Sequence, residues 1–385
     1  PLLTLAGFPV TTWTQTRLQL QSTPPPHRYS KSLSHIMHDY INSYNPQMRN
    51  YPQMRIVYES MMKENTSLDE PDAPEIRIYG NEDSGFSHYT YNDNNVENNT
   101  DIDTPEPTPP WEFYYTNEML LGNGVSPPSR LNLKGCDCEG GQCHLNTGKT
   151  KNNSRKPCSC LQKQEDHTKI YDVHGFMYNQ DGLLKKNGLP VFECNSLCGC
   201  GEECRNRVVG QGRKCKVMLK KTPKKGWGVF ACEKIPEGTF IGIYSGELLG
   251  HEESEERAIK YDEFGRTYLF DIDWWAPNSD SSESDSSASS SNSDSEEETR
   301  RPSKYTIDAY HAGNFTRFLN HSCDPNAALT PVYIDVDEIE RPLLTIFSKR
   351  EIQDQEEITF SYSGDPDVDD DDIDIVRNTQ SLQTT

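Results

Sequence analysis

Nine of the twelve cysteines in this 385-residue chain fall in one stretch with regular spacing. An odd number of thiols cannot pair completely as disulfides, whereas nine thiolates can hold three zinc ions if six sulfurs bind one metal and three bridge two. The alternative is two ordinary four-cysteine zinc sites with a spare thiol, and the repeated Cys-x-Cys pairs favour the shared cluster. Thiols so dense and committed to metal also indicate a reducing compartment, the cytosol or the nucleus. The predicted ligands are Cys136, Cys138, Cys143, Cys158, Cys160, Cys194, Cys198, Cys200 and Cys204.

Five short motifs after the cysteines combine aromatic, glycine and hydrogen-bonding side chains. Each alone is weak evidence, because a Gly-x-Gly is usually a turn, Asn-His-Ser-Cys can be an ordinary loop and a lone tyrosine usually packs in a core. Their order in one chain is far more specific. The motifs are Lys225-Gly226-Trp227-Gly228-Val229-Phe230, Tyr244-Ser245-Gly246-Glu247, Tyr268-Leu269-Phe270, Arg317-Phe318-Leu319-Asn320-His321-Ser322-Cys323 and Ile358-Thr359-Phe360-Ser361-Tyr362.

Short strand-like runs must position these motifs. We predict strands over 228–232, 239–244, 268–273, 305–308, 343–347 and 358–360, and one short helix over 251–261. Strands this short, separated by Gly and Pro turns, favour several small sheets over a doubly wound fold. A Ser-rich acidic tract over 278–301 and an Asp-rich tract over 365–374 cannot bury enough apolar surface to offset the entropy of ordering, so we expect both to be mobile.

Composition limits the possible partners. Only 33% of the chain is hydrophobic, and its formal net charge is −22. This charge makes direct, sequence-specific DNA binding unexpected and makes a basic peptide a natural partner. We expect no membrane partner, because no apolar run approaches the ~18 residues that a membrane span needs. The sequence starts with Pro1 rather than Met, which is typical of a fragment.

In their order after nine cysteines, the five motifs resemble the SET-domain lysine methyltransferases, specifically the suppressor-of-variegation family that methylates lysine 9 of histone H3. The resemblance covers residues 112–364. It implies a mainly β SET fold of small curved sheets, with a pseudoknot in which the segment ending at Tyr362 is threaded beside Asn320-His321. A zinc-cluster pre-SET module precedes this fold. We therefore divide the chain into 1–74, unassigned and largely disordered; 75–131, an extended segment packing on the SET unit; 132–210, pre-SET; 211–364, SET with the insertion 278–301; and 365–385, an acidic tail in place of a post-SET domain.

The resemblance also implies the site residues. Tyr362 is the catalytic tyrosine, and Tyr244 points a second hydroxyl at the target amine. Phe360 lines the amine pocket, where phenylalanine is typical of enzymes that trimethylate. Asp271 and Asp273 lie on a strand that pairs with the histone tail in relatives. The residues expected to hold the cofactor S-adenosylmethionine are Lys221, Trp227, Gly228, Tyr268, Arg317, Asn320 and His321.

The expected function is methylation of the histone H3 tail in heterochromatin formation and gene silencing, in the nucleus and on the chromosome, with chromatin proteins as further partners. No cysteine follows Cys323, a possible metal ligand whose partners in relatives belong to a later cysteine group. We therefore expect weak methyl transfer by this chain. The alternatives are a non-catalytic SET scaffold on chromatin and a methyltransferase for another lysine. The joint presence of Tyr244, Asn320 and Tyr362 favours an enzyme, because a scaffold has no need of them together.

Overall fold

The computed structural model of the protein describes residues 29–32, 72–74, 76–79, 114–138, 141–143, 149–150, 153–154, 158–168, 171, 173–222, 225–262, 268–272 and 303–362. The tracts that we expect to be mobile, 278–301 and 365–374, lie outside these residues.

The described chain is mainly β-structure, as the sequence predicts. The strands are β1 (Tyr29–Ser32), β2 (Arg77–Tyr79), β3 (Tyr114–Tyr115), β4 (Met119–Leu121), β5 (Lys149–Thr150), β6 (Asn153–Ser154), β7 (Val191–Phe192), β8 (Val217–Thr222), β9 (Gly226–Ala231), β10 (Phe240–Ile243), β11 (Glu247–Gly250), β12 (Leu269–Asp271), β13 (Tyr305–Asp308), β14 (Ala312–Gly313), β15 (Asn320–His321), β16 (Ala327–Tyr333), β17 (Leu343–Ser348) and β18 (Glu357–Phe360). The helices are α5 (Ser159–Thr168), α6 (His251–Asp262) and the 3-10 helix η3 (Phe315–Phe318).

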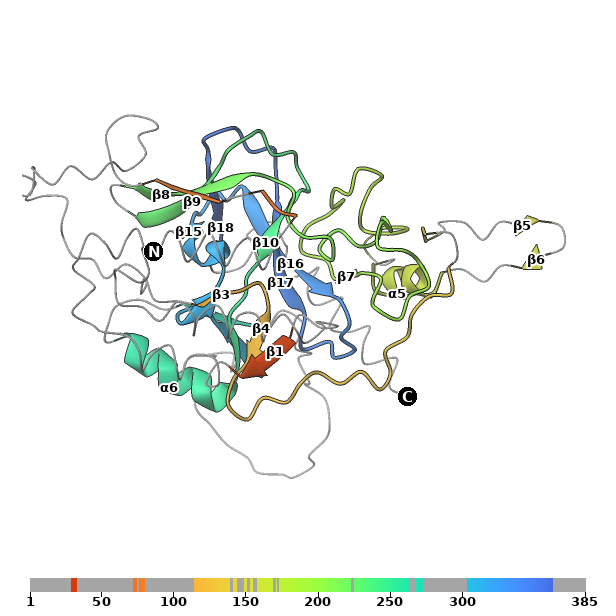
Figure 1. Ribbon diagram of the computed structural model, residues 1–385, viewed down its shortest axis with the longest axis horizontal. Coiled ribbons are helices and arrows are strands. Elements are labelled where there is room, and N and C mark those ends of the chain that lie inside the picture. The colour runs from red at the N-terminus through yellow and green to blue at the C-terminus, as the bar shows by residue number, and fades with distance from the viewer. Residues whose placement is uncertain are drawn as a thin grey trace, which may run out of the picture.

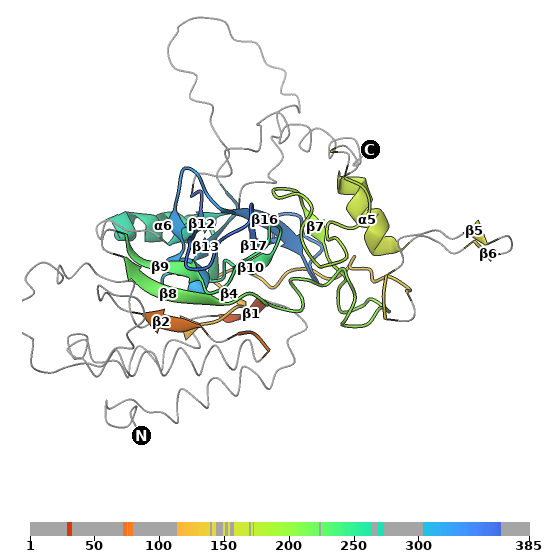
Figure 2. The ribbon, with the colours of Figure 1, turned by 90° about the horizontal axis from the view of Figure 1, so that it is seen from above.

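The strands form several small sheets, and this prediction is also confirmed. The larger sheets have the strand orders β1-β4-β11-β13-β12, β15-β18-β9-β8-β2 and β10-β17-β16-β7, and two pairs, β14-β3 and β5-β6, complete the described set. The hairpin of β8 and β9 lies beside β15 and β18, while α5 and the cysteine-rich region lie beyond β7 (Figure 1). Seen from above, β2 lies along β8, where it adds a parallel edge strand (Figure 2).

Strand β18 carries the threading that the resemblance implies. It pairs in parallel with β15, with Asn320 opposite Thr359 and His321 opposite Phe360. On its other side it pairs antiparallel with β9. The backbone N–H of Ser322 donates to the carbonyl of Phe360 at 3.1 Å. The last described strand therefore lies between two segments that are far from each other in sequence.

Strands buried on both faces supply the core. Every residue of β16 and β17 is buried, so these strands are mostly apolar and do not alternate between apolar and polar positions. Ile307, Phe315, Phe347 and Ile358 are fully inaccessible to solvent. Burying each such side chain stabilises the fold by ~1.5–3 kcal/mol.

Helix α6 has favourable charges at both ends. Glu252 and Glu253 lie in its first turn and Lys260 in its last, which complements the helix dipole. Its buried residues are Ser254 and Tyr261. No helix among the described residues is long and apolar enough to cross a membrane.

Candidate active site and zinc cluster

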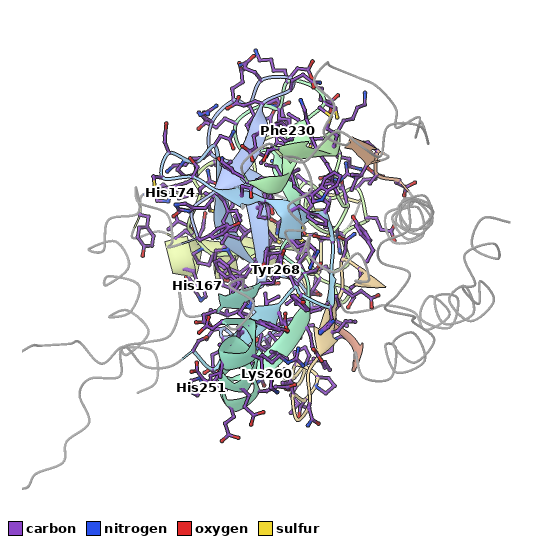
Figure 3. The ribbon with its side chains drawn as sticks, turned by 90° about the vertical axis from the view of Figure 1, so that its left-hand side faces the viewer. His167, His174, Phe230, His251, Lys260 and Tyr268 are labelled. Carbon is purple, nitrogen blue, oxygen red and sulfur yellow. The ribbon has the colours of Figure 1, made fainter. Side chains whose placement is uncertain are left out.

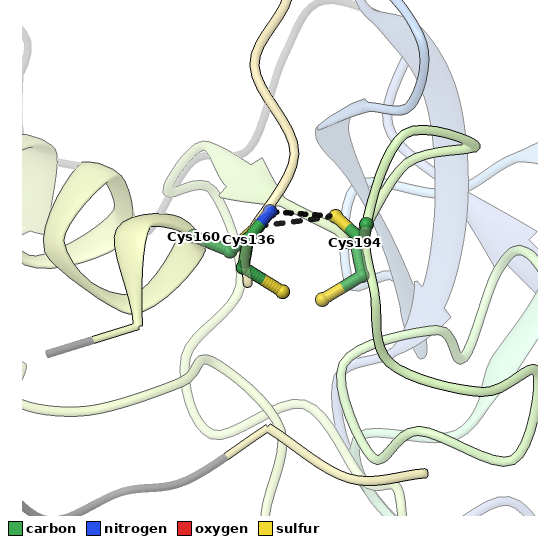
Figure 4. Close-up of side chains that lie close together, drawn as sticks. Cys136, Cys160 and Cys194 are labelled. Atoms are coloured by element: carbon green, nitrogen blue, oxygen red, sulfur yellow. Dashed lines mark hydrogen bonds between the residues drawn. The ribbon is translucent and has the colours of Figure 1, made fainter. Parts of the chain in front are cut away.

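The nine predicted ligand cysteines lie together in one cluster. Eight are buried, and Cys198 is half-buried. The Sγ atom of Cys143 lies 3.5 Å from that of Cys136 and 3.3 Å from that of Cys194. Figure 4 shows Cys136, Cys160 and Cys194 converging from separate segments, with Cys160 at the start of α5.

The sulfur positions fit zinc. Tetrahedral zinc with Zn–S bonds near 2.3 Å places its sulfurs about 3.8 Å apart. Three sets of four cysteines have all their sulfurs within 4.8 Å of one another. Three residues, Cys136, Cys143 and Cys194, belong to more than one set. Shared sulfurs are what a cluster with bridging thiolates needs, whereas separate four-cysteine sites would share none.

Hydrogen bonds from Cys160 and Cys194 lower the pKa of Cys198 to about 2, whereas hydrogen bonding to Cys158 and other neighbouring sulfurs raises the pKa of Cys143. N–H groups also face the sulfurs: the backbone of Asn195 donates to Cys198 at 3.2 Å, and the Arg207 guanidinium lies 3.7 Å from Cys200. Such donors orient and stabilise metal-bound thiolates.

Trp227 and Gly228, which are expected to bind the cofactor, lie on β9 and contact Asn320 of β15. Asn320 Nδ2 donates to the Trp227 carbonyl at 3.1 Å and to Glu357 Oε1 at 2.7 Å. A Cβ atom on Gly228 would lie only 2.8 Å from that Glu357 oxygen and 3.1 Å from Asn320 Nδ2, so a larger residue there would displace these two side-chain ends. Lys221 pairs with Trp227 through the backbone, and its side chain lies outside the described part of the chain.

Arg317 connects the cofactor residues to Tyr268. It lies in η3, where its Nε donates to the Ala309 carbonyl at 2.7 Å and a terminal nitrogen donates to the Tyr310 carbonyl at 2.9 Å. Its guanidinium lies 4.5 Å from the centre of the Tyr268 ring, within cation–π range. Tyr268 lies near the middle of the molecule, between the strand that carries Phe230 and helix α6 (Figure 3).

Aromatic rings form a compact group beside these residues. The Phe360 ring lies 5.0 Å from Tyr362, 6.2 Å from Phe270 and 6.5 Å from Tyr244, centre to centre. Phe360 and Tyr244 are buried, whereas Tyr362 is 54% exposed. The group is therefore apolar within and open to solvent at Tyr362.

Backbone carbonyls hold both tyrosine hydroxyls. Tyr244 donates to the carbonyl of Tyr268 at 3.2 Å, and Tyr362 donates to that of Leu319 at 2.7 Å. Burial, and then the proximity of Tyr362, raises the pKa of Tyr244; burial of its hydroxyl end raises the pKa of Tyr362 to about 12. Both hydroxyls are thus protonated at neutral pH.

His321 faces the chain that carries Tyr362. Its Nδ1 accepts the backbone N–H of Tyr362 at 3.1 Å, and its Nε2 lies 3.5 Å from Cys323 Sγ. This contact makes His321 a structural partner of Tyr362. Cys323 is exposed, and among the described residues it belongs to none of the cysteine sets.

The two aspartates predicted to contact substrate are not equally placed. Asp271 is exposed on β12, the edge strand of its sheet, and accepts a hydrogen bond from the Thr306 hydroxyl at 2.5 Å. Asp273 lies outside the described residues. Sequence reasoning missed Phe270, although it stands two positions after Tyr268 in the same motif. It also missed Glu357, for which the sequence carries no signal.

Comparison with known proteins identifies the family. The SET domain model matches residues 226–363, and the Pre-SET motif model matches residues 88–207. A histone-lysine N-methyltransferase of Cryptococcus neoformans, described as H3 lysine-9 specific, is 35% identical over 365 residues, or 90% of this chain. Histone-lysine N-methyltransferase Su(var)3-9 of Drosophila pseudoobscura is 35% identical over 69% of it. The chain belongs to the suppressor-of-variegation family of SET-domain proteins.

The chain matches only part of the length of its relatives. The chain spans 18% of the length of the Cryptococcus protein and 36% of that of the Drosophila protein. Among solved structures, the Neurospora SET domain protein DIM-5, a histone lysine methyltransferase, has a TM-score of 0.51 at 25% identity. That likeness covers 74% of this SET-domain chain and 94% of DIM-5.

Proposed function

We propose that this SET-domain protein transfers methyl groups from S-adenosylmethionine to the histone H3 tail, at lysine 9. One observation carries the proposal. Two hydroxyls, those of Tyr244 and Tyr362, are held by backbone carbonyls at an aromatic group that also contains Phe360. The choice of lysine 9 rests on the relatives, since the Cryptococcus protein is described as specific for it.

S-adenosylmethionine supplies an electrophilic methyl group on a sulfonium cation. Trp227, Gly228, Tyr268, Arg317, Asn320 and His321 are the residues proposed to hold the cofactor, and Lys221 is the proposed partner of its carboxylate. Contacts among them support this set: Asn320 donates to the Trp227 carbonyl, and the Arg317 guanidinium lies against the Tyr268 ring.

The target lysine must lose its proton before it can attack. With an ordinary pKa near 10.4, only about 0.1% of a lysine amine is neutral at pH 7.4. An apolar aromatic channel disfavours the charged form and lowers that pKa. Tyr244 and Tyr362 can then orient the neutral amine through their hydroxyl oxygens, which keep acceptor lone pairs while they donate to carbonyls. No histidine is needed as a base in this scheme.

The histone tail is proposed to add a strand at the β12 edge. The motive is the family resemblance, in which the strand that follows Tyr268 pairs with the tail; on the corresponding strand β12, Asp271 is exposed. Asp271 and Asp273 are proposed to face the basic tail, and the net charge of −22 favours such a partner. An exposed aspartate on an edge strand also limits aggregation, which is its ordinary role.

The cysteine cluster is proposed to hold three zinc ions, as a structural module. We also propose that residues 132–210 form the pre-SET module that contains this cluster, and that residues 211–364 form the SET domain. Action on chromatin in the nucleus, with chromatin proteins as partners, follows from the proposed substrate.

Methyl transfer from labelled S-adenosylmethionine to an H3 tail peptide tests the proposal. The full-length protein should label the peptide, and replacing lysine 9 by arginine should abolish the label. Tyr362→Phe should lower kcat by about a hundredfold, the scale on which a positioned catalytic group acts. Tyr333→Phe is the matched control, because it removes a buried hydroxyl that donates to the Ile339 carbonyl at 2.7 Å away from the aromatic group.

Three outcomes would contradict the proposal. Label that persists on the arginine peptide would reject lysine 9 as the target. Full activity of Tyr362→Phe would remove Tyr362 from its role. An equal loss in Tyr333→Phe would show that the effect is on stability and not on the reaction.

A further inference from the structure

Asp308, at the end of β13, is a buried carboxylate with partners on helix α6 and on the segment that follows β13. It is 1% exposed. Its Oδ2 accepts hydrogen bonds from the Arg257 guanidinium at 2.6 Å and from the Tyr261 hydroxyl at 2.7 Å, both on α6. Its Oδ1 accepts the backbone N–H of Tyr310 at 2.8 Å. The carboxylate therefore joins helix α6 to the chain that leaves β13.

The segment that Asp308 holds is the one that receives Arg317. The carbonyls of Ala309 and Tyr310 both accept hydrogen bonds from the Arg317 guanidinium. The Tyr310 N–H lies in the same peptide plane as the Ala309 carbonyl, so its hydrogen bond to Asp308 orients that carbonyl, and the Tyr310 carbonyl follows directly in the chain. Arg317 is thus aimed by backbone that is itself held from α6.

The same segment also reaches the tyrosine side of the site. The N–H of Ala309 donates to the Tyr268 carbonyl at 3.1 Å, and this carbonyl also accepts the Tyr244 hydroxyl. Aromatic contacts follow the same path: Tyr261 stacks on Tyr310 at 4.8 Å, and Tyr310 lies 5.8 Å from Tyr268. Movement at Asp308 would therefore displace Tyr268 and the group that orients Tyr244.

The charges around Asp308 are costly to bury. Arg257 also contacts Glu247 and Glu253, each at 2.6 Å, so one guanidinium faces three carboxylates. Glu247 lies opposite Asp308 in the pairing of β11 with β13. A buried ion network of this kind is often no more stable than apolar residues of similar size, so stability alone does not account for it. Its directional hydrogen bonds give it a second use, in fixing geometry.

We infer that Asp308 is a positioning residue for the cofactor side of the site, and that Arg257 and Tyr261 of α6 hold it in place. The inference rests on the proposed function, because that proposal is what assigns Arg317 and Tyr268 to the cofactor site. Asp308 acts through the backbone of Ala309 and Tyr310 and touches no reacting atom. Helix α6 is, on this account, part of the site.

Calorimetric titration of the full-length protein with S-adenosylmethionine tests the inference. Asp308→Asn keeps an acceptor for the Tyr310 N–H but turns an amide N–H toward Arg257, so the Kd should rise about tenfold, which corresponds to 1.4 kcal/mol. Tyr261→Phe removes one hydrogen bond and should raise the Kd about fivefold. Measurements are made well below each variant's melting temperature.

Asp335→Asn is the matched control. Asp335 is also a buried aspartate, and it accepts the backbone N–H of Ser196 at 2.9 Å and lies 3.2 Å from the Arg130 guanidinium, at the contact with the cysteine-rich region. The substitution should lower the melting temperature and leave the Kd for S-adenosylmethionine within about twofold of wild type, because additive effects hold for separate sites.

Each outcome decides a different point. Unchanged affinity in Asp308→Asn overturns the inference while the proposed function stands. If that variant does not fold, unchanged affinity in Tyr261→Phe overturns it instead. An equal loss of affinity in Asp335→Asn shows that the effect is merely structural, and overturns it too. Failure of the wild-type protein to bind S-adenosylmethionine overturns the proposed function itself.

Discussion

Phe360→Tyr should shift the product of methyl transfer from trimethyl-lysine toward mono- and dimethyl-lysine. Phe360 is 2% exposed, and its ring lies 5.0 Å from Tyr362 and 6.5 Å from Tyr244. A hydroxyl added there enters a space that the methylated amine must also use, and it can hold a water against that amine. Displacing one net hydrogen bond costs about 1 kcal/mol. Since 1.36 kcal/mol is tenfold in rate, the third transfer should slow by about fivefold.

Mass spectrometry of H3 tail peptides measures the rate of each methyl transfer, so Phe360→Tyr needs no separate control variant. The unmodified peptide serves as internal control, because its amine still fits and its first transfer should keep nearly the wild-type rate. The dimethylated peptide should react more slowly with Phe360→Tyr. A wild-type protein that stops at one methyl, or a variant that trimethylates at the parent rate, would refute this role for Phe360.

The cluster and the pH dependence give two further predictions. Metal analysis should find three zinc ions per chain, and a strong chelator should unfold the region between Cys136 and Cys204 first; two ions would discard the shared cluster. Methyl transfer should rise with pH from about 7 to about 9, because the neutral fraction of the lysine amine grows about tenfold per unit below its pKa. The raised pKa values of Tyr244 and Tyr362, the latter about 12, keep both hydroxyls protonated over that range. A fall in rate above pH 8 in a protein that stays folded would implicate another group.

Local patterns predicted six of the described strands, β9, β10, β12, β13, β17 and β18. The strand predicted over 305–308 coincides with β13, and the helix predicted over 251–261 ends one residue later, at Asp262. The other described strands, among them β8, β11 and β16, and helix α5 were missed. In β16 the signal was masked by Pro331, because proline is usually excluded from strand interiors. Strand β7 pairs with Val332 and Tyr333 of β16, so Pro331 lies in the part of β16 just before that pairing begins.

The arrangement of the site could not come from local patterns. Asn320 meets Thr359 across the parallel pairing of β15 and β18, and no periodicity in either segment specifies that partner. The motifs identified Tyr244, Phe360 and Tyr362 through the family resemblance alone. The carbonyls of Leu319 and Tyr268, which hold the hydroxyls, carry no side-chain signal at all. The contacts of Asp308 likewise depend on how α6 packs on β13.

The cysteine-rich region joins the rest of the described fold through the pairing of β7 with β16. Strand β7, which ends two residues before Cys194, pairs in parallel with the end of β16. Glu193 accepts the Tyr178 hydroxyl at 2.8 Å and the backbone N–H of Val209 at 2.6 Å, so a buried carboxylate fixes the chain just before that ligand. Because metal ligation is worth on the order of 10 kcal/mol in small domains, zinc bound at Cys194 would hold this edge of the β16 sheet in place. The aromatic group lies on β12 and β18 or directly after β10 and β18, and β10 belongs to the same sheet as β16 and β7, so zinc bound at Cys194 would reach this group through the strands of that sheet.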